Sequence, residues 1–285
     1  MKRAGSKKAV TAFNGEALRW ELRDGVVEVT LDHAPLNEIG TVMLGDLQRF
    51  AAAIPGLASV TSACIFSSAR PGGFSAGADL KELYEGALKL SPKKRKMGVR
   101  GFLQRIHKVL NAIDAAPFIT FVAVHGICMG GGLELALACD QIVADRMARF
   151  GFPELRLGLI PGFGGIPRLR RDVGNSFIRD LLFTGRTVKA ESAHQGGLVT
   201  HVVGEGYALQ VARSMAQQVM KFDAETRTAA KRFIKPIPKA ELRKEIELFC
   251  KLFDRPVVME SLRRFVESNE PLKHLPAAQS SSQHG

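Results

Sequence analysis

Two glutamates stand in apolar surroundings, and each lies next to a turn that contains glycine. Glu134 follows Gly130-Gly131-Gly132 and alternates with leucines at positions 133, 135 and 137, whereas Glu154 follows Gly151-Phe152-Pro153. An ionised carboxyl group can act as a base, and a neutral one can act as an acid. Apolar surroundings and a nearby negative charge both raise a carboxyl pKa, so a close pair of glutamates can supply both forms at the same pH.

The three glycines connect two predicted elements. They follow an apolar run at 121–124 that predicts a buried strand, and they precede the segment LELALACD, which predicts a helix. The first turn of a helix has N–H groups without a partner, and glycine lets a ligand approach them closely. The turn is therefore a candidate site for an oxygen that bears negative charge. The alternatives are close packing for the glycines and helix-dipole stabilisation for Glu134.

A second loop of small residues, Ser75-Ala76-Gly77-Ala78-Asp79, follows another predicted buried strand at 62–67. Its small side chains would leave the N–H of Ala78 open to a ligand. The alternative is a turn into a helix at 79–85, with Asp79 as the N-cap. Both interpretations can hold together, because a capping turn also presents free N–H groups.

These segments closely resemble the crotonase family, the enoyl-CoA hydratases and isomerases, in order and spacing from about residue 74 to residue 168. The rest of the chain, from about residue 16 to about residue 268, is compatible with that family. The resemblance rests on Ser75 through Asp79 with Lys81, Gly130 through Gly132 with Glu134, Cys139-Asp140, Phe150-Gly151 with Pro153-Glu154, and Gly158 through Gly165.

The resemblance implies that the N–H groups of Ala78 and Gly131 together hold the thioester oxygen of an acyl-CoA. It implies that Glu134 activates water and that Glu154 delivers a proton to Cα of the substrate. The segments implied to contact the substrate comprise Ala76, Ala78, Asp79, Leu80, Lys81 and Gly131. Neither a metal ion nor a redox cofactor is expected, and coenzyme A enters as part of the substrate.

The presence of both glutamates favours an enoyl-CoA hydratase, which adds water across the 2,3 double bond of a 2-enoyl-CoA. The first alternative is a 3,2-enoyl-CoA isomerase, which needs only one shuttling carboxylate, at Glu154. A lyase, another crotonase reaction or an acyl-carrier-protein substrate also stays open. Acyl chain length and branching are not determined by these residues.

The chain carries a formal net charge of +12, partly concentrated in three basic segments. These are Lys93–Lys96 with Arg100, Arg168–Arg171, and Lys231–Lys244, and each is expected to be a solvated face. The charge suits the phosphates of an acyl-CoA. It also raises the alternative of an RNA-binding protein on the same fold, although no aromatic residues interleave Lys93–Lys96 to stack bases, so nucleic acid is not the expected partner.

No apolar run is long enough to span a bilayer, and the basic N-terminus lacks the apolar region of a secretory signal. The four cysteines show no CxxC pairing, and three lie in apolar segments. We therefore expect buried free thiols in a reducing cytoplasm.

Three further segments carry structural expectations. Residues 18–31 predict a hairpin that turns at Asp24-Gly25. Residues 102–113 predict an amphipathic helix with His107 on its polar, surface side, whereas 86–98 is expected to be an irregular surface segment. Beyond Gly206 only helices are expected, at 207–221, 225–233, 239–253 and 256–268.

The alternation of strands and helices predicts an α/β protein. The resemblance implies a crotonase-type spiral of ββα units, with C-terminal helices that build a homotrimer or a dimer of trimers and cover the pocket. We expect a flexible tail at 1–15, a core domain at 16–205, a helical C-terminal subdomain at 206–268 and a disordered tail at 269–285.

Overall fold

A computed structural model describes residues 10–268 of the 285-residue chain. The expected tails at 1–9 and 269–285 lie outside the described residues. The N-terminal prediction needs one correction, because strand β1 (Ala12–Asn14) lies within the segment expected to be a tail and pairs with β2 (Leu18–Arg23). The pairing is reinforced by side chains, since the rings of Phe13 and Trp20 stack with centroids 4.4 Å apart.

The larger sheet has seven strands in the order β1-β2-β3-β4-β6-β8-β11. Strands β2 and β3 (Val26–Leu31) form the predicted hairpin, and both turn residues, Asp24 and Gly25, have positive φ. From β3 onward neighbouring strands are parallel. The remaining bounds are β4 (Ala63–Ser68), β6 (Ile119–Val124), β8 (Gln141–Asp145) and β11 (His201–Val203).

A second sheet of four short strands has the order β10-β9-β7-β5. Its members are β5 (Gly73–Ser75), β7 (Ile127–Met129), β9 (Arg149–Gly151) and β10 (Val188–Lys189). Strands β5, β7 and β9 each follow a strand of the larger sheet, namely β4, β6 and β8, and a helix comes next. This repeat of two strands and a helix confirms the predicted spiral of ββα units.

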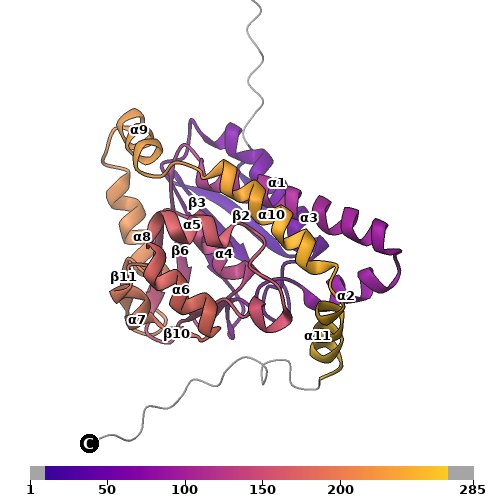
Figure 1. Ribbon diagram of the computed structural model, residues 1–285. Coiled ribbons are helices and arrows are strands. Elements are labelled where there is room, and N and C mark those ends of the chain that lie inside the picture. The colour runs from indigo at the N-terminus through magenta and orange to yellow at the C-terminus, as the bar shows by residue number, and fades with distance from the viewer. Residues whose placement is uncertain (1–9, 269–285) are drawn as a thin grey trace, which may run out of the picture.

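The helices surround these sheets, and α10 lies across α3 and α5 at the front of Figure 1. Those of the spiral are α1 (Thr41–Leu57), α2 (Leu80–Leu88), α3 (Pro92–Asp114), α4 (Gly131–Ala138), the 3-10 helix η1 (Glu154–Leu157), α5 (Gly165–Asp172), α6 (Asn175–Thr184) and α7 (Ala190–Gln195). The C-terminal helices are α8 (Ala208–Val219), α9 (Ala224–Ile234), α10 (Lys239–Phe253) and α11 (Pro256–Glu267). They match the four helices expected beyond Gly206.

The sequence predicted an irregular surface segment at 86–98, and the prediction of irregularity is wrong. Helix α2 continues to Leu88 and α3 begins at Pro92, so only three residues separate them. Proline at the first position of α3 has a φ that is already suited to a helix, and the lysines and arginine that follow are good helix formers. The basic side chains Lys93, Lys94 and Lys96 are exposed, as expected.

The prediction that His107 lies on the surface is wrong. It is 5% exposed, and its Nε2 lies 2.8 Å from the carbonyl oxygen of Gly162. Helix α10 packs against α3, so this region of α3 is covered although its sequence is polar. A surface assignment from helical periodicity alone misses such a partner.

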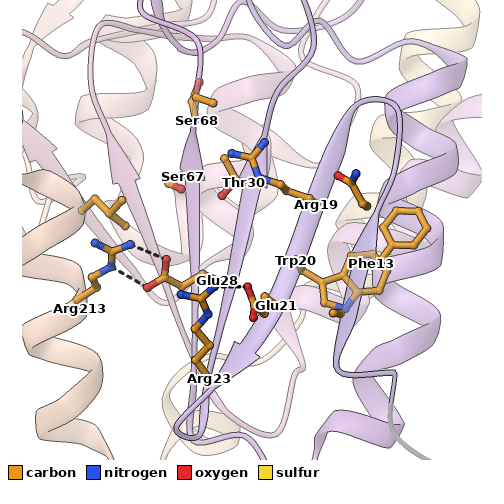
Figure 2. Close-up of a pocket in the computed structure, with 14 residues that line it drawn as sticks. Phe13, Arg19, Trp20, Glu21, Arg23, Glu28, Thr30, Ser67, Ser68 and Arg213 are labelled. Atoms are coloured by element: carbon orange, nitrogen blue, oxygen red, sulfur yellow. Dashed lines mark hydrogen bonds and ion pairs between the residues drawn. The ribbon is translucent and has the colours of Figure 1, made fainter.

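The hollow of about 1140 Å³ in Figure 2 lies against β1, β2, β3 and α8. Its charged side chains largely pair with one another. Arg213 on α8 donates to Glu28 on β3 at 2.7 Å, and Arg23 donates to Glu21 at 2.7 Å. The charged groups there are paired within the chain, and neither Glu134 nor Glu154 lines the hollow.

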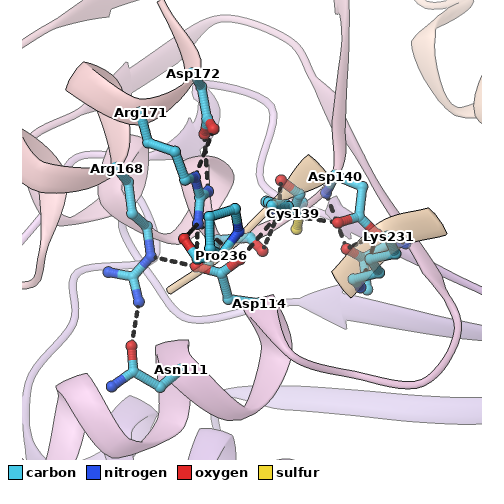
Figure 3. Close-up of polar contacts among 12 residues, drawn as sticks. Asn111, Asp114, Cys139, Asp140, Arg168, Arg171, Asp172, Lys231 and Pro236 are labelled. Atoms are coloured by element: carbon cyan, nitrogen blue, oxygen red, sulfur yellow. Dashed lines mark hydrogen bonds and ion pairs between the residues drawn. The ribbon is translucent and has the colours of Figure 1, made fainter. Parts of the chain in front are cut away.

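Two of the basic segments are partly buried, contrary to the expectation of solvated faces. Arg168 is fully buried and donates to Asp114 at 2.9 Å, while Arg171 donates to the same carboxylate at 3.0 Å (Figure 3). Lys231 is 5% exposed and pairs with Asp140 at 2.8 Å. The buried Asp114 and the partly buried Asp140 compensate these cations, which is the condition under which charges are tolerated inside a protein.

Within residues 10–268 no helix has both the length and the apolar character needed to cross a membrane. All four cysteines are buried free thiols, as the sequence predicted.

Candidate active site

A cavity of about 370 Å³ lies among α2, α3, α4, η1 and α10. Both predicted amide donors, Ala78 and Gly131, line it, and so do both glutamates. Most of the remaining wall is apolar and comes from distant parts of the chain: Leu83, Leu90, Val99, Phe102, Leu103, Leu157, Leu159, Phe163 and Phe249. The cavity therefore combines a few polar groups with an apolar lining, as ligand sites commonly do.

The two loops of small residues meet at this cavity. Gly77 has φ +103°, and a Cβ added to it would lie 2.9 Å from the carbonyl oxygen of Met129 and 3.2 Å from the nitrogen of Gly131. A Cβ added to Gly131 would lie 3.3 Å from the nitrogen of Ala78. Only glycine at these positions lets the loops approach so closely.

The structure records no hydrogen bond from the amide of Ala78 or Gly131 to any of the residues 10–268. Gly131 begins α4, so its N–H has no partner within that helix. Two adjacent amides that border one cavity can both donate to a single ligand oxygen. The structure thus brings the two predicted donors together, and their role remains a prediction.

Glu134 lies in the first turn of α4 and is 2% exposed. Its Oε1 accepts two hydrogen bonds, from the backbone N–H groups of Phe163 and Gly165, both at 2.7 Å. Burial raises the pKa of Glu134 to about 7, and these amides oppose the rise by stabilising the ionised form. Glu134 is thus held in place as a carboxyl group that ionises near neutral pH.

Glu154 begins η1, and its Oε2 is buried without a hydrogen-bond partner among the described residues. Burial raises the pKa of Glu154 well above its usual value, and the negative charge of Glu134 raises it further. Glu134 therefore ionises first while Glu154 keeps its proton. Gly130 makes room for this carboxyl, because a Cβ at that position would lie 2.6 Å from Oε1 of Glu154.

The predicted substrate contacts divide into two groups. Ala76, Asp79 and Leu80 line the cavity together with the two amide donors. Lys81 is outside the lining: its side chain is 73% exposed and lies 4.0 Å from Glu85. Asp79 also caps α2, since its carboxylate accepts the N–H of Glu82 at 2.8 Å, so the alternative structural interpretation of this residue is confirmed.

Sequence reasoning missed Glu245 on α10 as a buried residue near the site. Its side chain is 5% exposed, although no polar residue of this helix was predicted to lie in the interior. A signal was available, because Glu245 falls between Leu242, Ile246 and Phe249 on the apolar face of α10.

Among residues 10–268 no group of three or more His, Cys, Asp or Glu side chains is arranged to hold a metal ion.

The fold and the cavity define a ββα-spiral protein with two buried carboxyl groups beside two free amides. The family model of the enoyl-CoA hydratases and isomerases matches residues 21–273, and the chain belongs to this family. The crotonase resemblance drawn from the sequence is thereby confirmed.

Relatives agree with this assignment. The chain is 36% identical over 255 residues to a probable mitochondrial enoyl-CoA hydratase 2 of Arabidopsis thaliana, covering 87% of this chain and 81% of the relative. It is 35% identical over 204 residues to an enoyl-CoA isomerase/hydratase of Mycosarcoma maydis, covering 70% of this chain and 72% of the relative. A crystal structure of an enoyl-CoA hydratase from Bacillus halodurans has a TM-score of 0.78 at 24% identity, with coverage of 87% and 99%, which supports the fold alone.

Proposed function

We propose that this protein is an enoyl-CoA hydratase, which adds water across the 2,3 double bond of a 2-enoyl-CoA thioester. The observation that carries the proposal is that Glu134 and Glu154 border the same cavity as the amides of Ala78 and Gly131. The names of the relatives include hydratases and one isomerase/hydratase. Two carboxyl groups with separated pKa values favour hydration over isomerisation.

In this mechanism the N–H groups of Ala78 and Gly131 bind the thioester oxygen. Negative charge develops on that oxygen when a nucleophile adds to Cβ, and each donor of this kind contributes about 3 kcal/mol to the transition state. The two amides belong to separate loops that glycines bring together, so the site is organised before the substrate arrives.

Glu134 in its ionised form removes a proton from water, and the hydroxide oxygen bonds to Cβ. The electron pair of the double bond moves toward the thioester, and Glu154 delivers a proton to Cα. After the reaction Glu134 carries a proton and Glu154 is ionised, so a proton must return to Glu154 before the next turnover. The higher pKa of Glu154 favours this return.

The alternative is a 3,2-enoyl-CoA isomerase, in which Glu154 alone moves a proton between two carbons. The family description covers both activities. Under that alternative Glu134 would be dispensable. Its buried position, with two amides directed at one oxygen, supports a chemical role.

The deciding experiment measures hydration of 2-enoyl-CoA thioesters of several chain lengths by loss of the conjugated thioester absorbance. We expect Glu134→Gln and Glu154→Gln each to lower kcat by at least about 100-fold, because each removes one proton-transfer group. A parallel assay follows isomerisation of 3-enoyl-CoA. If Glu134→Gln keeps full isomerase activity while the unsubstituted protein hydrates nothing, the isomerase is the correct assignment.

We further propose that the substrate is an acyl-CoA, that no separate cofactor is needed, and that the chain assembles as a homotrimer or a dimer of trimers. The cytoplasm is the proposed compartment. The name of the Arabidopsis relative supports mitochondria as the alternative, and that compartment is equally compatible with free thiols.

A further inference from the structure

The segment 162–166, called here the loop 162–166, ends in the first two residues of α5 and lies between two buried carboxyl groups from other helices. Glu134 on α4 accepts the N–H groups of Phe163 and Gly165. Glu245 on α10 accepts the N–H of Ile166 through Oε2 at 3.3 Å. The amide of Gly164 also acts on Glu245, since it stabilises the ionised form and so lowers the pKa of that carboxyl. The two glutamates therefore bind neighbouring amides of one short loop.

The carbonyl oxygens of the same loop are bound by buried side chains as well. Arg168 donates through Nη1 to the carbonyls of Phe163 and Gly164, both at 3.3 Å. His107 Nε2 donates to the carbonyl of Gly162 at 2.8 Å. Gly164 has φ +102°, and a Cβ there would overlap Arg168 Nη1 at 2.0 Å. Side chains from α3, α5 and α10 therefore hold the conformation of this segment, in addition to the contacts that it makes with Glu134.

The surroundings of Glu245 favour its neutral form. Its Oε1 is buried without a hydrogen-bond partner among the described residues. The charged and titratable groups that face it are His107 from α3, Glu134 from α4 and Arg168 from α5. Burial raises the pKa of Glu245 well above its usual value, and the charge of Glu134 raises it further.

Of the two basic neighbours only Arg168 lowers the pKa of Glu245, and burial together with the charge of Glu134 outweighs it. His107 Nε2 is 3.7 Å from Oε1 of Glu245 and is committed to the carbonyl of Gly162. Burial lowers the pKa of His107 to about 4, so the ring is neutral at neutral pH. Arg168 is paired with the buried Asp114 at 2.9 Å. Burial and the neighbouring Glu134 therefore favour the protonated form of Glu245.

We propose that Glu245 is a positioning residue for Glu134. As a neutral carboxyl group it holds the loop 162–166 from α10, so that the N–H groups of Phe163 and Gly165 stay directed at the base. This inference rests on the proposed function, in which Glu134 activates water. In this inference α10 helps to position Glu134, although α10 lies about a hundred residues beyond the glycine turn in the sequence.

Two substitutions separate the hydrogen bond from the charge. Glu245→Gln keeps an oxygen that accepts the N–H of Ile166 and carries no charge, whereas Glu245→Leu removes the acceptor at similar volume. Glu241 provides the matched control, because it lies on the same helix but is 45% exposed and pairs with Arg170. Glu241→Leu should change neither the rate nor its pH dependence.

The first readout is kcat, KM and the pH profile of kcat/KM for hydration. In Glu245→Leu we expect kcat to fall at least about tenfold with KM changed by less than about threefold, because a misplaced base slows the chemical step. The acidic limb should move to higher pH, since Glu134 loses aligned amides that favour its ionised form. Glu245→Gln should restore most of kcat and the position of the limb.

The second readout is amide hydrogen exchange in a peptide covering 162–166, which requires no activity. We expect exchange at least about tenfold faster in Glu245→Leu than in the unsubstituted protein or in Glu245→Gln. If the unsubstituted protein hydrates no 2-enoyl-CoA, the proposed function fails, and hydrogen exchange still decides whether Glu245 orders the loop.

Three results would overturn the inference. The first is a Glu245→Leu variant with an unchanged acidic limb and unchanged exchange. The second is a Glu245→Gln variant as impaired as the leucine variant. The third applies even if Glu245→Leu fails to fold: a limb that moves to lower pH in the near-isosteric Glu245→Gln variant would mean that Glu245 carries a charge in the resting protein.

Discussion

At the scale of single residues, the site depends on two identical side chains in different surroundings. Glu134 receives two backbone N–H groups on one oxygen, whereas Oε2 of Glu154 receives none among the described residues. Both carboxyl groups are desolvated, but Glu134 accepts two amides of another segment, whereas the only amide that lowers the pKa of Glu154 is its own. In the proposed mechanism this difference makes Glu134 the base and Glu154 the acid, although the two residues are of the same type.

The difference predicts a bell-shaped pH dependence of kcat/KM for hydration. Activity should rise with pH as Glu134 loses its proton near pH 7, and it should fall at higher pH as Glu154 loses the proton it must donate. Steady-state kinetics across the pH range checks this. In Glu154→Gln the alkaline limb should disappear from the residual activity, and a rate that is flat from pH 5 to pH 7 would contradict the assignment of Glu134 as the base.

At the scale of elements, the end of α3 connects the site to the C-terminal helices. Asp114, the last residue of α3, pairs with Arg168 and Arg171 of α5, and with Lys235 next to α9 at 3.2 Å. Burial raises the pKa of Asp114, but these cations outweigh burial and the net shift is downward. The network (Figure 3) holds Arg168 where it binds the loop beside Glu134.

Asp114→Asn should therefore destabilise the fold strongly, because it leaves Arg168 buried without its counter-charge. We expect a loss of about 3–5 kcal/mol in the free energy of unfolding, measured by denaturant titration. Asp32→Asn is the control, since Asp32 pairs with the exposed Arg19 and should cost less than about 1 kcal/mol.

The contribution of Asp114 should also depend on pH in a defined direction. Its folded-state pKa lies below the ordinary value of 3.8, so its stabilisation is present above that value and is lost as the pH falls below it. Equal effects of Asp114→Asn and Asp32→Asn would show that the buried pairs contribute nothing beyond surface pairs.

At the scale of the whole molecule, the net charge of +12 should attract an anionic ligand such as the proposed acyl-CoA substrate. Not every basic residue contributes equally, since Lys96 pairs with Asp254 and Arg100 pairs with Glu247, whereas Lys93 and Lys94 are exposed with no recorded ion pair among the described residues.

Salt should weaken this attraction. Between about 0.02 M and about 0.3 M ionic strength we expect KM for an enoyl-CoA to rise several-fold, because the screening length falls to below about 10 Å. The N-acetylcysteamine thioester of the same acyl group lacks the phosphates and serves as the comparison substrate. Parallel changes in KM for both substrates would exclude electrostatic attraction as the cause.

The sequence alone determined the features that depend on near neighbours in the chain. The hairpin follows from Asp24-Gly25 between alternating strands, and the two loops follow from small residues after apolar runs. Glu134 and Glu154 were recognisable because carboxyl groups are rare inside apolar segments and the motif spacing is specific. These signals are local, so no knowledge of the packing was needed.

Only the tertiary structure decided which polar groups are buried and what they face. Arg168, Lys231 and His107 carry polar side chains that the sequence assigned to the surface, and Lys81 lies outside the cavity. Glu245 reaches the loop beside Glu134 only because α10 packs across α3 and α5. Burial depends on which faces of distant elements meet, and a periodic pattern within one helix does not specify its partner.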